Sequence, residues 1–281
     1  MARVEPTVQS GGLLKLYQAL WAPYYQAVLN TLGSTGVVLP LCDPHRGQPT
    51  TAFFTTKGEE RVTFTWSEPP RSFDTPLDLT DADSFQGIVP VIELNGTDEE
   101  ADTPDAAYWS RGDGSSDSAV SMGFWVNLDT LTSTPRLFDR YAGGAEWRYL
   151  VLSTGELRFQ TRDNSAGIEV KRESSAGAIA TGQWYFLVAT YDGAGGATAM
   201  DGATLYRDGA VLASTATNNG SYVAMENGTG VTKLGQEADG AGGELDGRIA
   251  GGPLGPFFTQ KELTADEIRA LYDLGRAGLG L

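Results

Sequence analysis

The sequence has only one cysteine and one histidine among its 281 residues. The lone Cys42 excludes an intramolecular disulfide, so the fold has to be stabilised by its hydrophobic core. The lone His45 excludes a metal site built from several histidines, and any histidine-based catalytic triad would have to use it. Because residues 43–47 have a composition typical of a turn, we expect no catalytic role for His45.

Basic residues are also scarce. The chain has 20 Lys and Arg against 36 Asp and Glu, which gives a formal net charge of −16. A protein that binds nucleic acid needs clustered basic side chains to contact phosphates, so we expect no nucleic-acid partner. The acidity favours solubility, and the alternative is that some of the carboxylates hold a cation.

Long apolar runs are missing as well. No stretch of about 18 apolar residues is present, so we expect no insertion into a membrane. The first six residues, MARVEP, have neither the apolar segment nor the cleavage site of a secretory signal.

The sequence is rich in short alternating segments bounded by turn residues, a pattern that predicts an all-β protein of about twelve or more strands. The clearest segment is 182–193, and Asp208-Gly209 predicts a tight hairpin turn soon after it. Asn95-Gly96 predicts a second hairpin. The other strands are expected at 51–56, 61–66, 88–94, 121–128, 137–139, 149–152, 157–162 and 168–172.

One helical segment is expected near the N-terminus, at residues 12–33. Apolar residues spaced by three and four form a stripe on one face. Pro23 interrupts this pattern, so we expect two helices or a kink. The stripe either packs on the β-sandwich or contacts a partner subunit, and aromatic anchors are common at interfaces. The candidate partner-binding residues are Leu13, Leu16, Tyr17, Leu20, Trp21 and Tyr24.

A second, short helix is expected at residues 264–274, near the C-terminus. Thr264 and Glu267 have the spacing of a capping box, in which each side chain bonds the backbone N–H of the other residue. Gly275 follows the last apolar residue of the pattern and is expected to end the helix.

Five segments together resemble a known family. They read "SMGFWVNLDTL", "GQWYFLVATYDG", "ATLYRDGAVLAS", "LGQEAD" and "LTADEIRALYDLG", and they span roughly residues 85–275. In this order they resemble the laminin G-like and pentraxin-like modules of the concanavalin A-like superfamily. The resemblance implies a two-sheet antiparallel jelly-roll sandwich at residues 37–281, preceded by an arm and helical segment at 1–36. It also implies a role in binding or adhesion.

The segments at 25–29 and 37–41 resemble the opening of laminin G-like modules in bacteriophage tail proteins. With no secretory signal visible, this resemblance implies a virion component of tail or capsid surface that leaves the cell by lysis. Its expected partners are other virion subunits, as a homo-oligomer, and a host-surface glycan. The alternative is a free glycan-binding lectin.

Catalysis is not expected, although glucanases share this fold. Retaining glycosidases need two closely spaced carboxylates, and the family pattern supplies three acidic residues along one strand. The nearest match begins with Glu244 and Asp246, but Arg248 follows where a third carboxylate would be needed. We therefore expect a non-enzymatic protein.

Calcium is the one cofactor that the resemblance implies. The "LGQEAD" segment is similar to a calcium-binding stretch of pentraxins, which maps the ligands onto Glu237, the backbone carbonyl of Ala238, and Asp239. The facing loop, 142–147, offers only Glu146, so the alternative is a polar loop without metal. The acidic segment 97–105 is expected to be a solvated loop, with a metal site as its alternative, and the resemblance implies a turn and strand there.

Candidate ligand-binding residues fall into two groups. Trp109, Trp147, Tyr149 and Tyr222 are aromatic residues of loops or strand ends that could stack on a sugar ring, whereas Trp125 and Trp184 are expected in the core. Alternation along 157–162 and 168–172 places a basic strip on an exposed face. It either is ordinary strand surface or contacts an acidic glycan or subunit. Its members are Arg158, Arg162, Lys171 and, less clearly from the alternation, Arg172.

Overall fold

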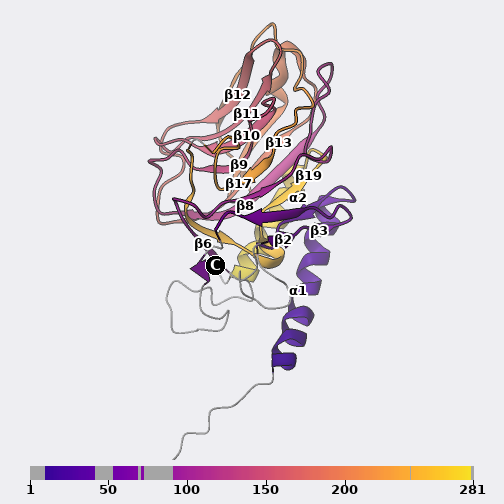
Figure 1. The fold of residues 1–281 in the computed structure, drawn as a ribbon, viewed down its shortest axis with the longest axis vertical. Coiled ribbons are helices and arrows are strands. Elements are labelled where there is room, and N and C mark those ends of the chain that lie inside the picture. Colours follow the sequence, from indigo (N-terminus) through magenta and orange to yellow (C-terminus); the bar gives the residue numbers. More distant parts are fainter. Residues whose placement is uncertain (1–9, 42–52, 69–70, 73–90, 241, 280–281) are drawn as a thin grey trace, which may run out of the picture.

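The computed structural model describes residues 10–41, 53–68, 71–72, 91–240 and 242–279. Over these residues the chain forms two antiparallel sheets packed face to face, with helix α1 (Ser10–Leu32) extending from one end of the sandwich (Figure 1). Cys42 and His45 lie outside the described residues. The predicted all-β jelly-roll sandwich, with a helix near each end of the chain, is confirmed.

The first sheet has ten strands among the described residues, and its centre is the long pair β8 (Val120–Leu128) and β13 (Trp184–Tyr191). All eight residues of β13 pair in register with β8, from Trp184 opposite Asn127 to Tyr191 opposite Val120. The remaining strands are β15 (Ala210–Val211), β14 (Ala203–Arg207), β18 (Asp246–Ala250), β6 (Val91–Asn95), β5 (Arg71–Ser72), β1 (Val37–Val38), β19 (Phe257–Thr259) and β3 (Lys57–Gly58).

The second sheet has nine strands among the described residues. Its order runs from β16 through the four longest neighbours to β2 at the other edge. In that order the strands are β16 (Ser214–Thr217), β12 (Ile168–Ser174), β11 (Leu157–Asp163), β10 (Trp147–Val151), β9 (Arg136–Arg140), β17 (Thr232–Leu234), β7 (Ala101–Thr103), β4 (Thr63–Trp66) and β2 (Phe53–Thr55).

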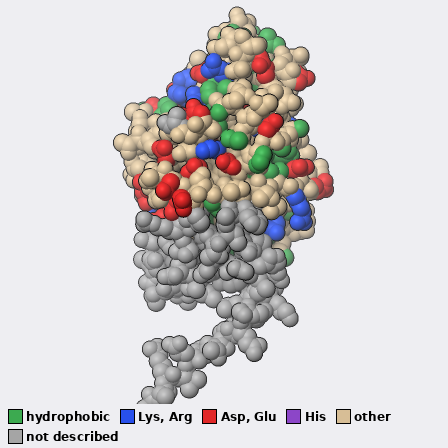
Figure 2. Space-filling model, viewed as in Figure 1, with side chains coloured by type: hydrophobic (Ala, Val, Ile, Leu, Met, Phe, Trp, Pro, Cys, Tyr) green, Lys and Arg blue, Asp and Glu red, His purple; other side chains and the backbone are tan. Residues whose placement is uncertain are grey.

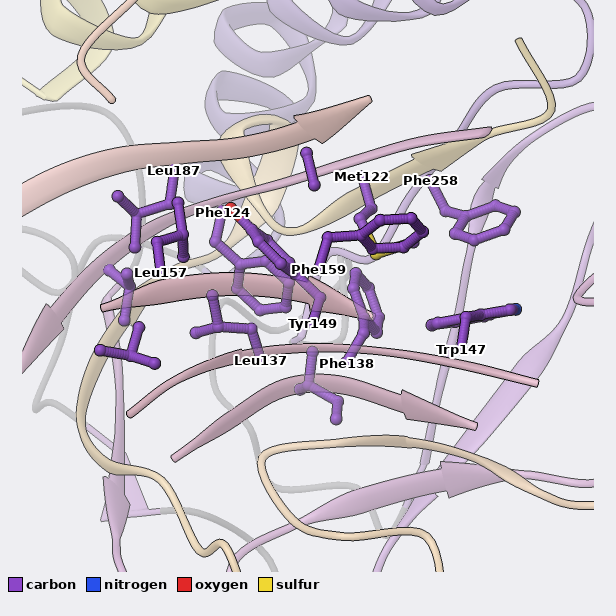
Figure 3. Close-up of a cluster of buried hydrophobic side chains, with 14 of the residues drawn as sticks. Met122, Phe124, Leu137, Phe138, Trp147, Tyr149, Leu157, Phe159, Leu187 and Phe258 are labelled. Carbon is purple, nitrogen blue, oxygen red and sulfur yellow. The ribbon is translucent and has the colours of Figure 1, made fainter. Parts of the chain in front are cut away.

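The main core fills the space between the sheets with apolar and aromatic side chains (Figure 3). Phe124 of the first sheet meets Phe138 of the second edge to face, with ring centres 4.7 Å apart. Trp147 and Phe258 approach across the same layer to 5.5 Å. Such contacts fit the alternation of the sequence, because each strand directs every second side chain into this layer.

A second apolar cluster covers the outer face of the ten-stranded sheet. Trp125 of β8 stacks on Tyr272 of helix α2 (Ala265–Leu279), with ring centres 5.5 Å apart and planes 11° from parallel. Val28 and Leu32 of α1 join the same cluster. The two helices therefore cover one outer face of the sandwich. Two short 3-10 helices, η1 (Gly196–Gly202) and η2 (Gly252–Leu254), lie in connections.

Helix α1 is one continuous element that contains Pro23, so of the two expected outcomes, two helices or a kink, the first is wrong. Trp21 is only 3% exposed and packs with the inter-sheet core, and Tyr24 packs against the cluster under α2. Both residues therefore contact the sandwich itself rather than standing free for a partner. Leu13, Leu16, Tyr17 and Leu20 lie on the part of α1 whose side chains the structure does not describe.

The capping box of α2 is confirmed. The backbone N–H of Thr264 donates to Glu267 Oε2 at 2.9 Å, and the N–H of Glu267 donates to Thr264 Oγ1 at 3.3 Å. The helix does not end at Gly275 but continues to Leu279, which corrects the expected end. A Cβ on Gly275 would lie 2.3 Å from Trp125 Nε1, so this glycine lets the helix approach the sheet closely.

The two expected hairpin turns have different outcomes. Asp208 and Gly209 have φ values of 55° and 74° and connect β14 to β15, as predicted. Asn95-Gly96 does not form a hairpin, because β6 before it and β7 after it belong to different sheets. The segment instead carries the chain from one layer of the sandwich to the other.

We predict that Trp21→Ala lowers the free energy of unfolding by about 3–5 kcal/mol, because it leaves a large cavity in the core. Val211→Ala is the control, since Val211 is 63% exposed and should change stability by less than about 0.5 kcal/mol. Urea denaturation of the full chain measures both. Equal midpoints for Trp21→Ala and Val211→Ala would show that α1 is not part of the folded core.

Gly275→Ala should destabilise the protein, because the new methyl group meets the Trp125 ring at 2.3–2.6 Å. We expect overpacking to cost about 1–3 kcal/mol, more than the roughly 1 kcal/mol that alanine gains as a helix former. Gly220→Ala is the matched control, since its methyl group meets nothing within 4 Å and its backbone is outside the left-handed region. A higher melting temperature for Gly275→Ala would contradict this packing.

Candidate binding face of the nine-stranded sheet

The outer face of the nine-stranded sheet carries charged side chains where the other outer face carries helices. Strand β11 places Arg158 and Arg162 outward and Phe159 into the core, as its alternation predicts. Arg172 pairs in register with Phe159 and so lies on the other side of β12, where its Nε donates to Ser214 Oγ at 2.8 Å. The inclusion of Arg172 in the basic strip is therefore wrong.

Acidic residues of β12 neutralise the basic strip. Arg162 pairs with Glu169 at 3.0 Å, Lys171 pairs with Glu173 at 3.2 Å, and Arg158 also contacts Glu173. These partners follow from the antiparallel register, which sets Arg158 opposite Glu173 and Arg162 opposite Glu169. The face is thus a ladder of alternating charges rather than a basic strip.

An aromatic residue that the sequence did not single out, Tyr141, lies beside these charged side chains. The Arg148 guanidinium lies 4.0 Å from the centre of the half-buried Tyr141 ring, within the range of a cation–π contact. Gln160 Nε2 donates to the Tyr141 hydroxyl at 2.9 Å, and that hydroxyl in turn contacts Glu169. Tyr141 follows the last residue of β9, so strand alternation could not indicate which way its ring points.

Among the arginines of this face, Arg148 has the weakest ion pair. Its closest carboxylate among the described residues is Glu237, at 3.9 Å. Its Nε is buried without a hydrogen-bond partner in the described structure. Together with its neighbours it forms a surface that we call the arginine face, defined as Tyr141, Arg148, Arg158, Gln160 and Arg162.

A loop after β17 folds over the edge of the arginine face. Asp139 Oδ1 accepts hydrogen bonds from the N–H of Ala238 at 3.0 Å and of Tyr141 at 2.9 Å. Glu237 contacts Arg136, whose Nε lies 3.6 Å from Asp139 Oδ2. Burial raises the pKa of Asp139 to about 6 in spite of these partners, and burial lowers the pKa of Arg136 to about 10.

The expected calcium ligands have other contacts here. Glu237 faces Arg136 and Arg148, so a cation at its carboxylate would have to displace a guanidinium. Glu146, the acidic residue of the facing loop, is fully buried and pairs with Arg140 at 2.8 Å. Among the residues that the structure describes, no group of three or more His, Cys, Asp and Glu could hold a metal ion. The Glu237 carboxylate is therefore used in ion pairs, and calcium at Glu237 and Asp239 stays a prediction.

The four candidate stacking aromatics are all buried, so their expected role is wrong. Trp147 and Tyr149 point into the space between the sheets (Figure 3) and have no exposed surface. The Trp147 ring nitrogen donates to the carbonyl of Trp109 at 2.9 Å. Tyr222 donates its hydroxyl to the buried carboxylate of Asp117 at 2.9 Å. None of these rings can stack on a sugar without rearrangement of the core.

Two acidic segments also differ in how they are used. The segment 97–105 contains the strand that the resemblance implies, because residues 101–103 form β7, and it is not a solvated loop. Glu100 is buried and accepts from Ser67 Oγ at 2.6 Å. In residues 244–248, the segment compared with the glucanase pattern, Arg248 lies 3.7 Å from Glu93 and 3.6 Å from Asp129. That cation is therefore part of an ion-pair network in the ten-stranded sheet.

Charges of both signs lie interspersed on the face of the molecule shown in Figure 2. The strongly negative net charge is thus not gathered into a single acidic field on that view. Across the described part of the chain, neither helix has the length and apolarity needed to span a membrane.

Asp139 gives a testable pH dependence. Its pKa of about 6 in the folded protein lies above its ordinary value of 3.8, so between these pH values the folded state binds more protons than the unfolded state. Its contribution to stability is therefore full below about pH 4 and is lost as the pH rises through 6, by about 3 kcal/mol. Asp139→Asn should remove that loss.

The measurement is the free energy of unfolding of wild type and Asp139→Asn from pH 4 to 7. Asp273→Asn is the control, because Asp273 is an exposed residue that pairs with Arg269 on α2. Parallel profiles for wild type and Asp139→Asn would show that Asp139 ionises normally in the folded protein.

Comparisons with known proteins place the chain in a family. A family model described as the concanavalin A-like lectin/glucanases superfamily matches residues 95–268. No curated protein sequence matches the chain. Two similar solved structures are the botulinum neurotoxin serotype G binding domain (TM-score 0.56, 10% identity, 87% of this chain and 52% of that one) and the serotype C1 binding domain (TM-score 0.51, 12% identity, 78% and 49%).

A third similar structure is the binding domain of botulinum neurotoxin DC in complex with SialylT, with a TM-score of 0.50 and 12% identity over 78% of this chain and 47% of that one. The chain spans about half the length of these structures, and at such identity the likeness concerns the fold alone. The family model, by contrast, covers more than half of the chain. The protein therefore belongs to the concanavalin A-like lectin/glucanase superfamily.

Proposed function

We propose that this chain is a non-enzymatic binding module that contacts a glycan through the arginine face. The observation that carries the proposal is the Arg148 guanidinium stacked on the half-buried Tyr141 ring, with no carboxylate closer than 3.9 Å among the described residues. A guanidinium offers up to five N–H donors, so Arg148 can still donate to a ligand.

The surroundings of Arg148 suit a polyhydroxylated ligand. The carboxylates of Glu169 and Glu173 supply hydrogen-bond acceptors, while Arg158 and Arg162 supply donors, and the buried Gln160 holds the Tyr141 hydroxyl. Sugar hydroxyl groups both donate and accept, so they pair well with a ladder of alternating charges. Because adjacent strands hold these side chains, the face is organised before any ligand arrives.

The superfamily includes glucanases, but two observations support a role without catalysis. The acidic pattern at Glu244 and Asp246 lacks a third carboxylate, and Arg248 in its place is held by Glu93 and Asp129. Beside the arginine face, burial raises the pKa of Glu173 but its contacts with Arg158 and Lys171 lower it by more, so the net pKa is below its ordinary value and Glu173 is a poor general acid. The proposed binding also requires no cofactor.

At a finer level, we propose that the module belongs to a bacteriophage virion, as a tail or capsid-surface protein that assembles with other subunits and attaches to the host surface. The support is the resemblance of residues 25–29 and 37–41 to openings of phage tail modules. The N-terminal part of α1 also extends beyond the strands in Figure 1, which suits attachment to a neighbouring subunit. Mass spectrometry of purified phage particles tests whether the protein is a virion component. If the protein is absent from the particles, the free-lectin alternative is favoured.

We predict that Arg148→Ala weakens glycan binding about tenfold or more, since a hydrogen bond to a charged group contributes about 1.5–3 kcal/mol. The experiment screens the full chain on an array of neutral and acidic glycans and then measures the best ligand by calorimetry. Arg269→Ala is the matched control, because it removes one positive charge from the exposed surface of α2. Equal affinities for the two variants, or no glycan bound by wild type, would overturn the proposal.

A further inference from the structure

A polar groove of about 750 Å³ lies apart from the arginine face, and none of its lining residues belongs to that face. Its walls come from the turn after α1, the turn that precedes β4, the loop between β7 and β8, and the segment after β19. The side chains that matter here are Ser34, Glu59, Glu60, Tyr108, Arg111 and Gln260.

Arg111 is an unusual member of this lining. Arg111 is only 8% exposed, and its guanidinium forms no ion pair within 4.0 Å with a described residue, although the nearby charge of Glu146 partly offsets its burial. Its only protein partners in the described structure are two carbonyls: that of Ser110, 2.7 Å from Nε, and that of Ala119, 3.4 Å from Nη1. A buried cation without a paired anion is costly, so an incoming anion has a large electrostatic incentive to bind there.

A neighbouring arginine, Arg140, shows how a buried guanidinium is paired with carboxylates. Arg140 is also buried, and it contacts Asp105 at 2.6 Å and Glu146 at 2.8 Å. Glu146 forms no ion pair with the Arg111 guanidinium. Its carboxylate accepts the backbone N–H of Arg111 at 3.2 Å, and its charge offsets only part of the burial of Arg111. Burial lowers the pKa of Arg111, yet a guanidinium keeps its proton in proteins, so Arg111 presents a positive charge to the groove.

We propose that Arg111 binds the carboxylate group of a small polar ligand in this groove. The Nη2 atom has no hydrogen-bond partner among the described residues, and a carboxylate matches the fork of donors that a guanidinium presents. This proposal goes beyond the arginine face and does not depend on it.

The opposite rim narrows the chemistry of the ligand. Glu59 and Glu60 line the groove as exposed residues, so they repel a doubly charged phosphate more than a singly charged carboxylate. The same carboxylates accept hydrogen bonds from hydroxyl or ammonium groups. The ligand is therefore a monocarboxylate that also carries such donors, a description that fits both an acidic sugar and an amino acid.

The test uses the full chain labelled with ¹⁵N and follows the Nε–H signal of Arg111 by NMR during titration with D-glucuronate or L-alanine. D-glucose and sodium chloride are the matched controls for the carbohydrate frame and for ionic strength. We expect at least one carboxylate probe to move the Arg111 signal saturably, with a millimolar Kd, while neither control does. The probe that binds identifies the source of the carboxylate.

Two variants sharpen the result. Arg111→Gln should abolish the saturable response at the neighbouring backbone signals, whereas Arg269→Gln, on exposed α2, should leave it unchanged. The wild-type titration decides the question even where Arg111→Gln fails to fold. The proposal is overturned if neither probe gives a saturable shift up to about 50 mM, or if sodium chloride gives the same shift. Arg111 would then serve only to link the carbonyls of Ser110 and Ala119.

Discussion

Strand β8 is buried along its whole length, and the layout of the molecule follows from that constraint. A strand directs alternate side chains to opposite faces, so β8 needs apolar cover on both sides. The second sheet provides it on one side through Phe138 and Tyr149, and the two helices provide it on the other, where Tyr272 stacks on Trp125. With both helices used on that face, the outer face of the nine-stranded sheet is left to charged side chains.

That division explains why the arginine face is a better place for binding than for stability. Exposed ion pairs such as Arg162–Glu169 contribute only about 0–1 kcal/mol, because water and salt screen them. A ligand can therefore replace a carboxylate partner at little cost to the fold. The buried pair Arg140–Glu146 differs, since removing one partner leaves an uncompensated charge in the core. Binding chemistry and structural chemistry thus use the same residue types in different environments.

The fold was predictable from the sequence because its determinants are local. Alternation located β8, β11 and β13, the Asp208-Gly209 dipeptide located a hairpin, and the spacing of Thr264 and Glu267 located the start of α2. The errors occurred where tertiary packing decides. Gly275 has the pattern of a helix end, but packing against Trp125 keeps it helical, and Asn95-Gly96 has the pattern of a hairpin while it joins two sheets.

The candidate sites were less predictable, because alternation reveals which way a side chain points but not what it meets. Arg158, Arg140 and Arg111 are alike in sequence terms. The structure makes the first a partly exposed residue paired across strands and the second a buried residue with two carboxylates. The third is a buried residue whose guanidinium donates only to carbonyls among the described residues. The charge left uncompensated after folding decides where an anion can bind. That charge depends on register and on contacts between distant loops, so only the assembled structure separates the arginines that stabilise it from those that are free to bind.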